Sequence, residues 1–190
     1  MLPKLIRSRR FGDERGWFCE SYSAERFGGL GVSDVFVQDN HSYSSLKGTL
    51  RGLHFQALPH AQAKLVRCIS GRIWDVAVDI RRGSPTFGRW VGGTLTAECG
   101  EQMYIPVGFA HGFVTLTDDV QVCYKASALY APESEGAIRW SDPALGIEWH
   151  LDGIEPVVSE KDASAPMLNE LTADFPFEGD PLDGLMEISL

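Results

Sequence analysis

The side chains best suited to acid–base chemistry lie in one stretch, GTLRGLHFQALPHAQAKLVRCISG, at residues 48–71. It places His54 and Lys64 ten positions apart among glycines, and a second histidine, His111, follows in another strand-like stretch. An imidazole titrates near neutral pH and can accept a proton, while an ammonium group stabilises a nearby anion. A base beside a cation is what proton removal next to a carbonyl group requires. The stretch therefore predicts a proton-transfer site.

The composition fits a globular protein and argues against one class of partner. The 190 residues include 44% hydrophobic and 23% charged side chains, enough for one domain with its own core. The formal net charge of −9 argues against nucleic acid, because a phosphate backbone binds to basic surfaces. Residues 163–190 carry two thirds of this charge, with six acids and no lysine or arginine. We expect a single domain over residues 1–190, with an acidic tail at 168–190 that covers a surface or a dimer contact.

The amino terminus and the cysteines predict a cytoplasmic protein without a membrane partner. The first apolar residues, in MLPKLIRSRR, are interrupted by proline and basic residues, unlike those of a signal peptide. No segment approaches the roughly 20 apolar residues of a membrane span. The cysteines are widely spaced and form no CxxC pair: Cys19, Cys68, Cys99 and Cys123. We expect free, mostly buried thiols rather than disulfides or a zinc site.

Turn-forming residues divide most of the chain into short strands. Residues 4–22 predict a strand, a turn and a strand, residues 34–41 another strand, and residues 49–121 a dense series separated by glycine and proline. A short helix is expected after Ser23, and one or two helical turns in MLNEL near residue 170. Strands without amphipathic helices between them predict an all-β sandwich or barrel. Beyond residue 130, prolines and tryptophans predict an irregular wrap around it.

The stretch RIWDVAVDI at residues 72–80 shows the clearest alternation. Trp74, Val76, Val78 and Ile80 form one apolar face, and the opposite face carries Asp75 and Asp79 between small and apolar residues. We expect the apolar face to lie in the core and the acidic face to border a cavity.

Two motifs resemble the paired signatures of the cupin jelly roll: GTLRGLH at residues 48–54 and GEQMYIPVGFAH at residues 100–111. In metal-binding cupins the first motif supplies two histidines and a glutamate. Here Gln56 replaces the second histidine and Lys64 replaces the glutamate. Because a protonated amine does not bind a divalent cation, the resemblance implies a cupin-type jelly-roll barrel with no metal and no cofactor. Lys64 then supplies the positive charge.

Longer stretches, from about residue 5 to residue 167, resemble the dTDP-4-dehydrorhamnose 3,5-epimerase family, and LRGLH, GFAHGF and YKASALYAPESE are the most specific of them. The resemblance implies the substrate dTDP-4-dehydro-6-deoxy-D-glucose, whose C4 ketone acidifies the protons on C3 and C5. Inversion through an enolate gives dTDP-4-dehydro-L-rhamnose, in dTDP-L-rhamnose synthesis. In this family the first strands cross over a dimer, so a homodimer is also implied.

The resemblance assigns catalytic roles to four residues. His54 matches the base, Asp162 the acid that holds its imidazole, and Lys64 the cation that stabilises the anion on O4. Tyr124 matches the acid that returns a proton on the opposite face of the sugar. Substrate-binding roles fall on Phe11, Arg15, Glu20, Gln38, Asn40, Arg51, Asp75, His111, Tyr130, Glu135 and Lys161. Among these, the basic residues match diphosphate-binding positions, and Phe11 matches a residue stacked on thymine.

The spacing of Arg51 and His54 conflicts with a regular strand. Residues three apart point to opposite faces, yet the resemblance places both side chains in one pocket. We therefore predict irregular backbone, a bulge or a twist, at Gly52.

Other functions remain open at this stage. One is a single-centre epimerase or a sugar 3,4-ketoisomerase, although the LRGLH histidine and the two tyrosines favour an epimerase over the ketoisomerase. Another is a non-catalytic cupin that binds a nucleotide sugar. The weakest is a metal-dependent cupin that uses His54 and His111.

Overall fold

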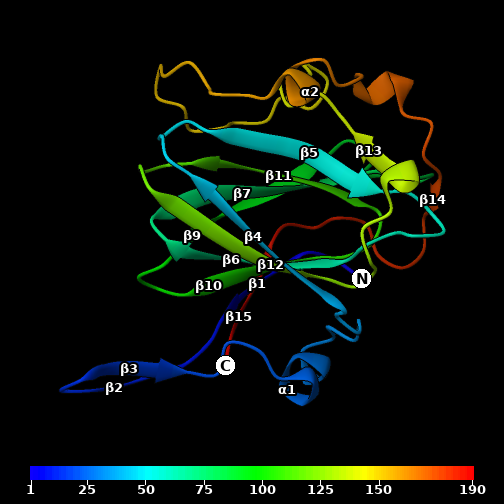
Figure 1. Cartoon of the computed structure of the whole chain (residues 1–190). Helices are drawn as coiled ribbons and strands as arrows, with labels where there is room; N and C mark the ends of the chain where they lie inside the picture. The colour runs from blue at the N-terminus through cyan, green and yellow to red at the C-terminus, as the bar shows by residue number, and fades with distance from the viewer.

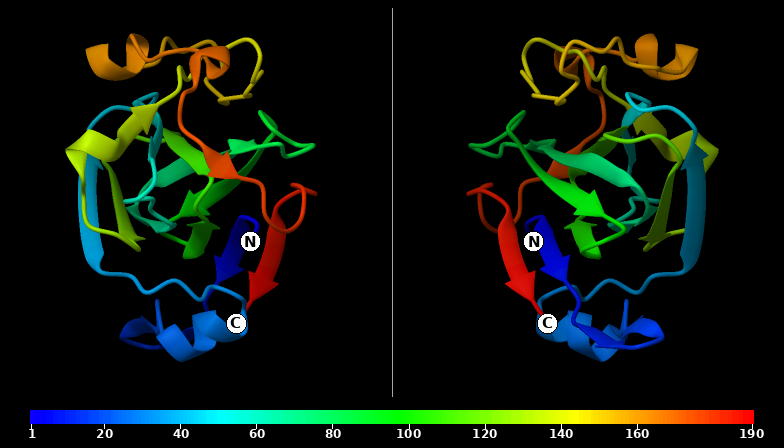
Figure 2. Two further views of the ribbon diagram at one scale, coloured as in Figure 1. Left: turned by 90° about the vertical axis from the view of Figure 1, so that its right-hand side faces the viewer. Right: turned by 90° about the vertical axis from the view of Figure 1, so that its left-hand side faces the viewer.

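Two β-sheets face each other in the computed structural model, which describes all 190 residues (Figures 1 and 2). The larger sheet has the spatial order β15 (Met186–Ser189), β1 (Lys4–Arg7), β10 (Glu101–Ile105), β6 (Lys64–Ser70), β12 (Val120–Ala126) and β4 (Gln38–Ser44). The smaller sheet has the order β13 (Glu135–Ala137), β5 (Leu50–Gln56), β11 (Phe109–Thr115), β7 (Arg72–Asp79) and β9 (Trp90–Thr96). The predicted all-β, jelly-roll architecture is confirmed.

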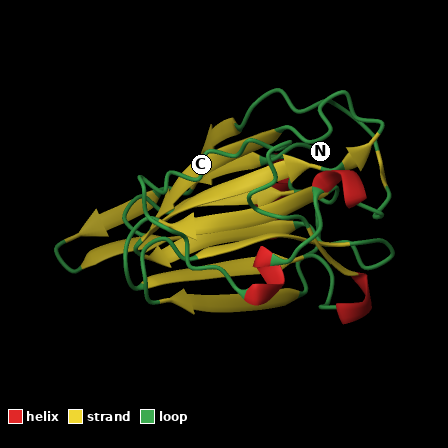
Figure 3. Ribbon diagram, turned by 90° about the horizontal axis from the view of Figure 1, so that it is seen from above, coloured by secondary structure: helices red, strands yellow, loops and turns green.

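The remaining elements lie outside the two sheets. They are the hairpin β2 (Arg10–Asp13) and β3 (Gly16–Cys19), the short pair β8 (Arg81–Arg82) and β14 (Phe175–Pro176), the helices α1 (Ala24–Gly29) and α2 (Glu160–Ala163), and the 3-10 turns η1 (Pro132–Ser134) and η2 (Leu168–Glu170). The hairpin and α1 project below the larger sheet, and α2 covers the smaller sheet (Figure 1). Seen from above, short helices flank a body of strands (Figure 3). No helix is long and apolar enough to cross a membrane.

The apolar residues form one core between the sheets and a second outside the smaller sheet. Ile73 and Ala77 of β7 point into the first, whereas Val76 and Val78 pack in the second, beneath the irregular segment that follows β13. Both faces of β7 are therefore buried, because this segment covers the outer side of its sheet. The alternating pattern predicted that the face of Asp79 borders a cavity, and for Asp79 this is wrong. Its carboxylate instead forms a buried ion pair with Arg81.

The backbone at Gly52 departs from a regular strand, as predicted. Gly52 has a φ of +122° and the Gly52–Leu53 peptide is cis. Between the pairs His111↔His54 and Phe113↔Arg51, strand β5 has one residue more than β11, which is a β-bulge. A Cβ atom on residue 52 would lie 2.6 Å from the Cα of Gly112, so only glycine fits this close approach. The extra residue turns Arg51 and His54 toward the same side.

Two local expectations are wrong. The strand expected over residues 34–41 begins only at Gln38, so the polar residues Gln38 and Asn40 open the strand instead of ending it. Of the four free cysteines only Cys68 is buried. The other three are partly or fully exposed because they lie on the projecting hairpin (Cys19), in the turn at residues 97–100 (Cys99) and at a surface pocket of the larger sheet (Cys123).

Candidate active site

A cavity of about 520 Å³ opens between the two sheets beside α2. It collects all four side chains with an expected catalytic role and three of those with an expected binding role, and strands of both sheets and α2 supply them. The lining residues are Ser42, Thr49, Leu50, Arg51, His54, Lys64, His111, Phe113, Tyr124, Val157, Val158, Ser159, Lys161 and Asp162.

His54 and Asp162 form a hydrogen-bonded pair on the wall made by β5 and α2. The Nε2 atom of His54 lies 2.7 Å from Oδ1 of Asp162, and Oδ2 accepts the Gly52 N–H at 3.1 Å. Burial acts to raise the pKa of Asp162, but the hydrogen bond and charge of His54 outweigh it, so the pKa lies below its usual value. Asp162 therefore stays ionised and fixes the imidazole, leaving Nδ1 to accept a proton.

Ser159 holds the aspartate in place. It is the N-cap residue of α2, and its Oγ accepts the N–H of Asp162 at 3.1 Å. Sequence reasoning did not assign Ser159 a role, although Ser followed three residues later by an acid is a recognisable helix-start pattern.

Lys64 lies deeper in the cavity, near a second histidine–carboxylate pair. Burial lowers the pKa of Lys64 to about 8, against the opposing effect of the negative charges of Asp75 and Glu135. The Nε2 atom of His111 lies 2.7 Å from Oδ1 of the fully buried Asp75. Burial also lowers the pKa of His111, and Lys64 and His54 add to this effect while Asp75 opposes it. The region therefore combines a poised cation with a histidine that favours its neutral form.

Tyr124 faces His54 from the other sheet. It lies on β12, and the Nζ atom of Lys64 sits 5.9 Å from the centre of its ring. Burial raises the pKa of Tyr124, Glu135 adds to the rise and Arg51 reduces it. The phenol therefore keeps its proton at neutral pH. A histidine on one wall of the cavity, with a protonated phenol and a lysine on the other, suits proton transfer on two faces of one ligand.

Gln56, at the position of the second histidine in the metal-binding cupin motif, uses its side chain to hold loops in place. Gln56 donates from Nε2 to the carbonyl groups of His60 and Leu129 at 2.7 and 3.2 Å, and its Oε1 accepts the N–H of Ala131 at 2.9 Å. It thereby ties two loops to β5. No group of three or more His, Cys, Asp or Glu side chains is placed to hold a metal ion.

A cluster of polar side chains lies beside the cavity and reaches it through the lining residue Lys161. The carboxylate of Glu135 accepts hydrogen bonds from Lys161 at 2.6 Å and from Tyr130 at 3.1 Å. The bond from Lys161 is the main cause that lowers the pKa of Glu135 and, in return, raises that of Lys161. Arg51 donates to Ser44 Oγ and to the Tyr43 carbonyl group, which hold its guanidinium at the cavity wall.

Several expected binding residues lie away from this cavity. Phe11 and Arg15 are on the projecting hairpin, and Glu20 follows it directly. Arg15 forms an exposed ion pair with Asp13 at 2.5 Å. Gln38 lies at the start of β4, where its side chain donates to Asn40 at 3.0 Å and accepts the Tyr130 N–H at 2.9 Å. The fold therefore gathers the acid–base residues around one cavity, whereas the expected binding residues on and beside the hairpin lie outside it.

The comparisons with known proteins agree with this geometry. A family model described as dTDP-4-dehydrorhamnose 3,5-epimerase matches residues 3–170. The chain belongs to this family. Among relatives within the epimerase family, the dTDP-4-dehydrorhamnose 3,5-epimerase of Salmonella typhimurium is 54% identical over 167 residues, which cover 87% of this chain and 90% of that protein.

Solved structures of the epimerase family have the same fold. The dTDP-6-deoxy-D-glucose-3,5-epimerase of Legionella pneumophila, in complex with dTDP-4-keto-L-rhamnose, superposes with a TM-score of 0.88 at 47% identity, covering 93% of this chain and 94% of that one. A 3'-monoepimerase from Streptomyces bikiniensis, in complex with dTDP-quinovose, gives a TM-score of 0.82 at 38% identity, covering 88% and 84% of the two chains. The chain is therefore similar both to 3,5-epimerases and to a 3'-monoepimerase.

Proposed function

We propose that the protein inverts C3 and C5 of dTDP-4-dehydro-6-deoxy-D-glucose and so forms dTDP-4-dehydro-L-rhamnose. The observation that carries the proposal is the placement of His54 and Tyr124 on opposite walls of one cavity. Inversion requires a proton to leave one face of the sugar ring and another to arrive on the opposite face. The 54% identity to the Salmonella enzyme over 87% of this chain supports the same substrate.

In the proposed mechanism His54 removes the proton from the carbon next to the C4 ketone. The electron pair of the broken C–H bond moves to O4, and the ammonium group of Lys64 stabilises the resulting enolate. Tyr124 then donates its phenolic proton to the other face of the same carbon. Asp162 stays ionised and stabilises the imidazolium, as its lowered pKa supports. Proton exchange with solvent restores His54 and Tyr124 before the second inversion.

Arg51 and Lys161 are the basic side chains at the cavity that we assign to the diphosphate. A guanidinium group suits paired contacts with phosphate oxygens. Lys161 is bound to Glu135 in this structure, so we propose that it turns from the carboxylate toward the diphosphate when substrate binds. His111 and Asp75 support Lys64, and Gln38, Asn40, Tyr130 and Glu135 contact the sugar or nucleotide.

We further propose a homodimer in which the hairpin enters the site of a second copy. Its aromatic side chains are unusually exposed, at 50% for Phe11, 59% for Trp17 and 70% for Phe18. Such a surface is typical of a contact with another protein. Phe11, Arg15 and Glu20 would then complete the partner's cavity. The cytoplasmic location stays a prediction.

Proton exchange in deuterated water tests the double inversion. Each inverted centre takes one deuteron from solvent, so mass spectrometry and NMR of the product count the centres directly. We expect deuterium at both C3 and C5. Label at one carbon alone would replace the proposal by a single-centre epimerase, which the likeness to the Streptomyces 3'-monoepimerase makes the leading second candidate.

Replacement of the base separates catalysis from binding. In His54→Asn the amide keeps a hydrogen bond but accepts no proton at neutral pH, so we expect turnover to fall about 10²–10⁴-fold. Calorimetric binding of dTDP should change little, because dTDP lacks the sugar carbons on which the base acts. Unlabelled substrate after incubation with the unaltered protein would instead indicate a cupin that only binds nucleotide sugars.

A further inference from the structure

The carboxyl-terminal residues 174–190, which lie beyond the family match, reach every part of the hydrophobic core. Phe175 is buried in the cluster outside the smaller sheet. Leu182 is buried between the sheets, and Leu185 packs against the same cluster. Leu190 packs against the third cluster, beside β1 and α1. This segment is therefore part of the packed body, although it carries most of the acidic residues of the tail.

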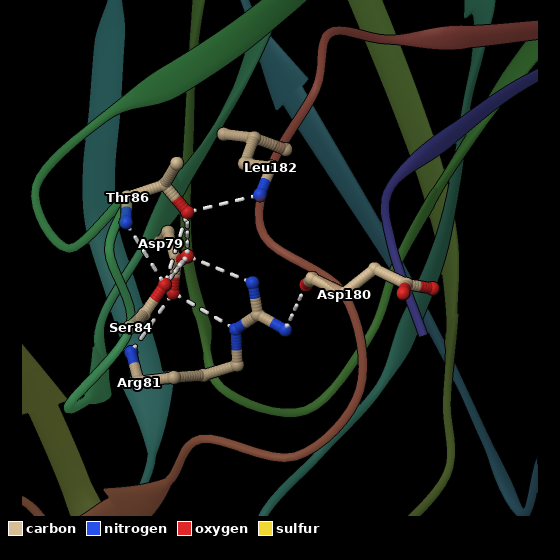
Figure 4. A network of polar contacts seen from close by, with 6 residues as sticks. All are labelled: Asp79, Arg81, Ser84, Thr86, Asp180 and Leu182. Atoms are coloured by element: carbon tan, nitrogen blue, oxygen red, sulfur yellow. Dashed lines mark hydrogen bonds and ion pairs between the residues drawn. The ribbon is translucent and has the colours of Figure 1, made fainter.

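A buried polar network fastens the middle of the segment (Figure 4). Arg81 donates to both carboxylate oxygens of Asp79 at 2.9 and 2.8 Å, and its third nitrogen donates to the carbonyl group of Asp180 at 3.1 Å. The N–H of Leu182 donates to Oγ1 of Thr86 at 2.9 Å. Asp79 and Arg81 are 0% and 4% exposed, so without the segment a buried guanidinium N–H would lose its acceptor.

The body of the protein is shaped to receive this segment. The guanidinium of Arg81 lies between two aromatic rings, 4.7 Å from that of Phe109 in β11 and 5.0 Å from that of Phe177 in the segment. A Cβ atom at Gly93 of β9 would lie 3.1 Å from Leu185. The contact surfaces on the two sides therefore match in shape as well as in charge.

The end of the segment forms strand β15, which pairs in parallel with β1 from Lys4↔Met186 to Arg7↔Ser189. The N–H of Leu190 adds a bond to the carbonyl group of Arg7 at 2.9 Å. Figure 2 shows the two strands side by side. β1 would otherwise be the edge of the larger sheet, with unpaired backbone groups. The hairpin starts at Arg10, three residues after β1 ends.

We propose that residues 174–190 form a clamp that fixes β1 to the barrel and thereby positions the projecting hairpin. The hairpin has few other attachments to the body. Arg10 donates to the carbonyl groups of Ala97 and Glu98, and Gln102 donates to Ser8 and to the carbonyl group of Ser21. The clamp doubles the strand pairing of β1, so it limits how far the root of the hairpin can move.

The clamp also accounts for two of the six tail acids. Asp174 lies 3.0 Å from Arg82, and Glu187 lies 3.6 Å from Arg7 at the end of β1. Both ion pairs are exposed and contribute little by themselves. They pair two acids of the segment with basic residues of β8 and β1.

Hydrogen–deuterium exchange on a shortened chain tests the clamp. A chain ending at residue 183 keeps the Arg81 network and removes β15 together with the packing contacts of Leu185 and Leu190. We expect the amides of residues 4–9 to exchange at least tenfold faster, while those of β5 and β11 keep their rates. The full-length variant Leu185→Asp weakens the packing of residue 185 against Gly93 without shortening the chain. We expect the amides of residues 4–9 to exchange faster in this variant as well. Asp183→Asn, an exposed acid in the same segment, is the matched control and should exchange like the parent.

Steady-state kinetics of the same variants tests the positioning role, which rests on the proposed function and on hairpin residues that contact the substrate. We expect KM for the dTDP-sugar to rise at least fivefold in both altered chains, with kcat within twofold of the parent. Unchanged exchange in residues 4–9 would overturn the clamp, whatever the kinetics. Faster exchange with unchanged KM would overturn the positioning of the hairpin. Failure of the parent to epimerise would count against the proposed function alone.

Discussion

The proposed role of Lys64 depends directly on its protonation state. In the proposed mechanism its ammonium form stabilises the enolate, and burial brings its pKa down to about 8. The group is therefore still mostly protonated at pH 7, but loses its proton within the range of ordinary assays. A lysine with an unperturbed pKa near 10.4 would not do so.

The loss of the Lys64 proton should be visible in the pH dependence of kcat/KM. As pH rises through about 8, Lys64 becomes neutral and enolate stabilisation is lost, so kcat/KM should fall on the alkaline side. In Asp75→Asn the amide can still accept from His111, but the negative charge that raises the pKa of Lys64 is gone. The alkaline limb should therefore move to lower pH. A limb that stays in place, or moves upward, would show that Lys64 is not the titrating group. A profile of kcat/KM between pH 6 and 10 for both proteins measures this.

At the scale of elements, the bulge in β5 decides where the base points. Gly52 combines a positive φ with a close approach to β11, and its N–H donates to the carboxylate that holds His54. A side chain here would disturb the sheet and the catalytic pair together.

Gly52→Ala should lower the free energy of unfolding by about 2–4 kcal/mol, because the methyl group clashes with backbone and the backbone conformation is strained. Gly16→Ala is the matched control: its φ is +130°, close to that of Gly52, but nothing lies within 4 Å of the added Cβ. The control should lose only about 1 kcal/mol, the conformational part alone. Urea unfolding of both variants gives the two values. Equal losses would mean that the close approach to β11 contributes nothing.

The elements differ in how far the sequence could specify them. Alternation and turn residues predicted most strands, and the conflict between Arg51 and His54 predicted the irregular backbone at Gly52. The start of β4 was misplaced because the exposed edge strand has a polar pattern that resembles a loop. The contact between His54 and Asp162 joins residues 108 positions apart. No local rule predicts such a contact, and only the family resemblance suggested it.

At the scale of the whole molecule, the proposed dimer makes each active site depend on two chains. A mixed dimer tests this. We expect His54→Asn and Arg15→Ala to be inactive or weak as homodimers, and their co-expressed mixture to regain about a quarter of the parent activity, because one of the two sites in each mixed dimer has neither defect. If Arg15 served its own chain, every site in the mixed dimer would carry a defect and no activity would return. Activity of affinity-purified mixed dimers distinguishes the two.

We also propose that residues 1–190 fold as a single domain, since residues of the tail pack into all three hydrophobic clusters. Thermal unfolding should then be one cooperative transition, with equal calorimetric and van't Hoff enthalpies. Substrate-free protein in a scanning calorimeter gives both values. An earlier, separate transition that disappears on removal of residues 174–190 would contradict the single domain.

The pairing of β1 with β15 also has a consequence for biosynthesis. Strand β1 can complete its hydrogen bonds only after residues 186–189 have left the ribosome, with all of residues 8–185 made in between. Pairing between such distant segments forms late and slowly. The nascent chain therefore carries an open strand edge while residues 8–185 are made, and we expect the pairing of β1 with β15 to form late in folding.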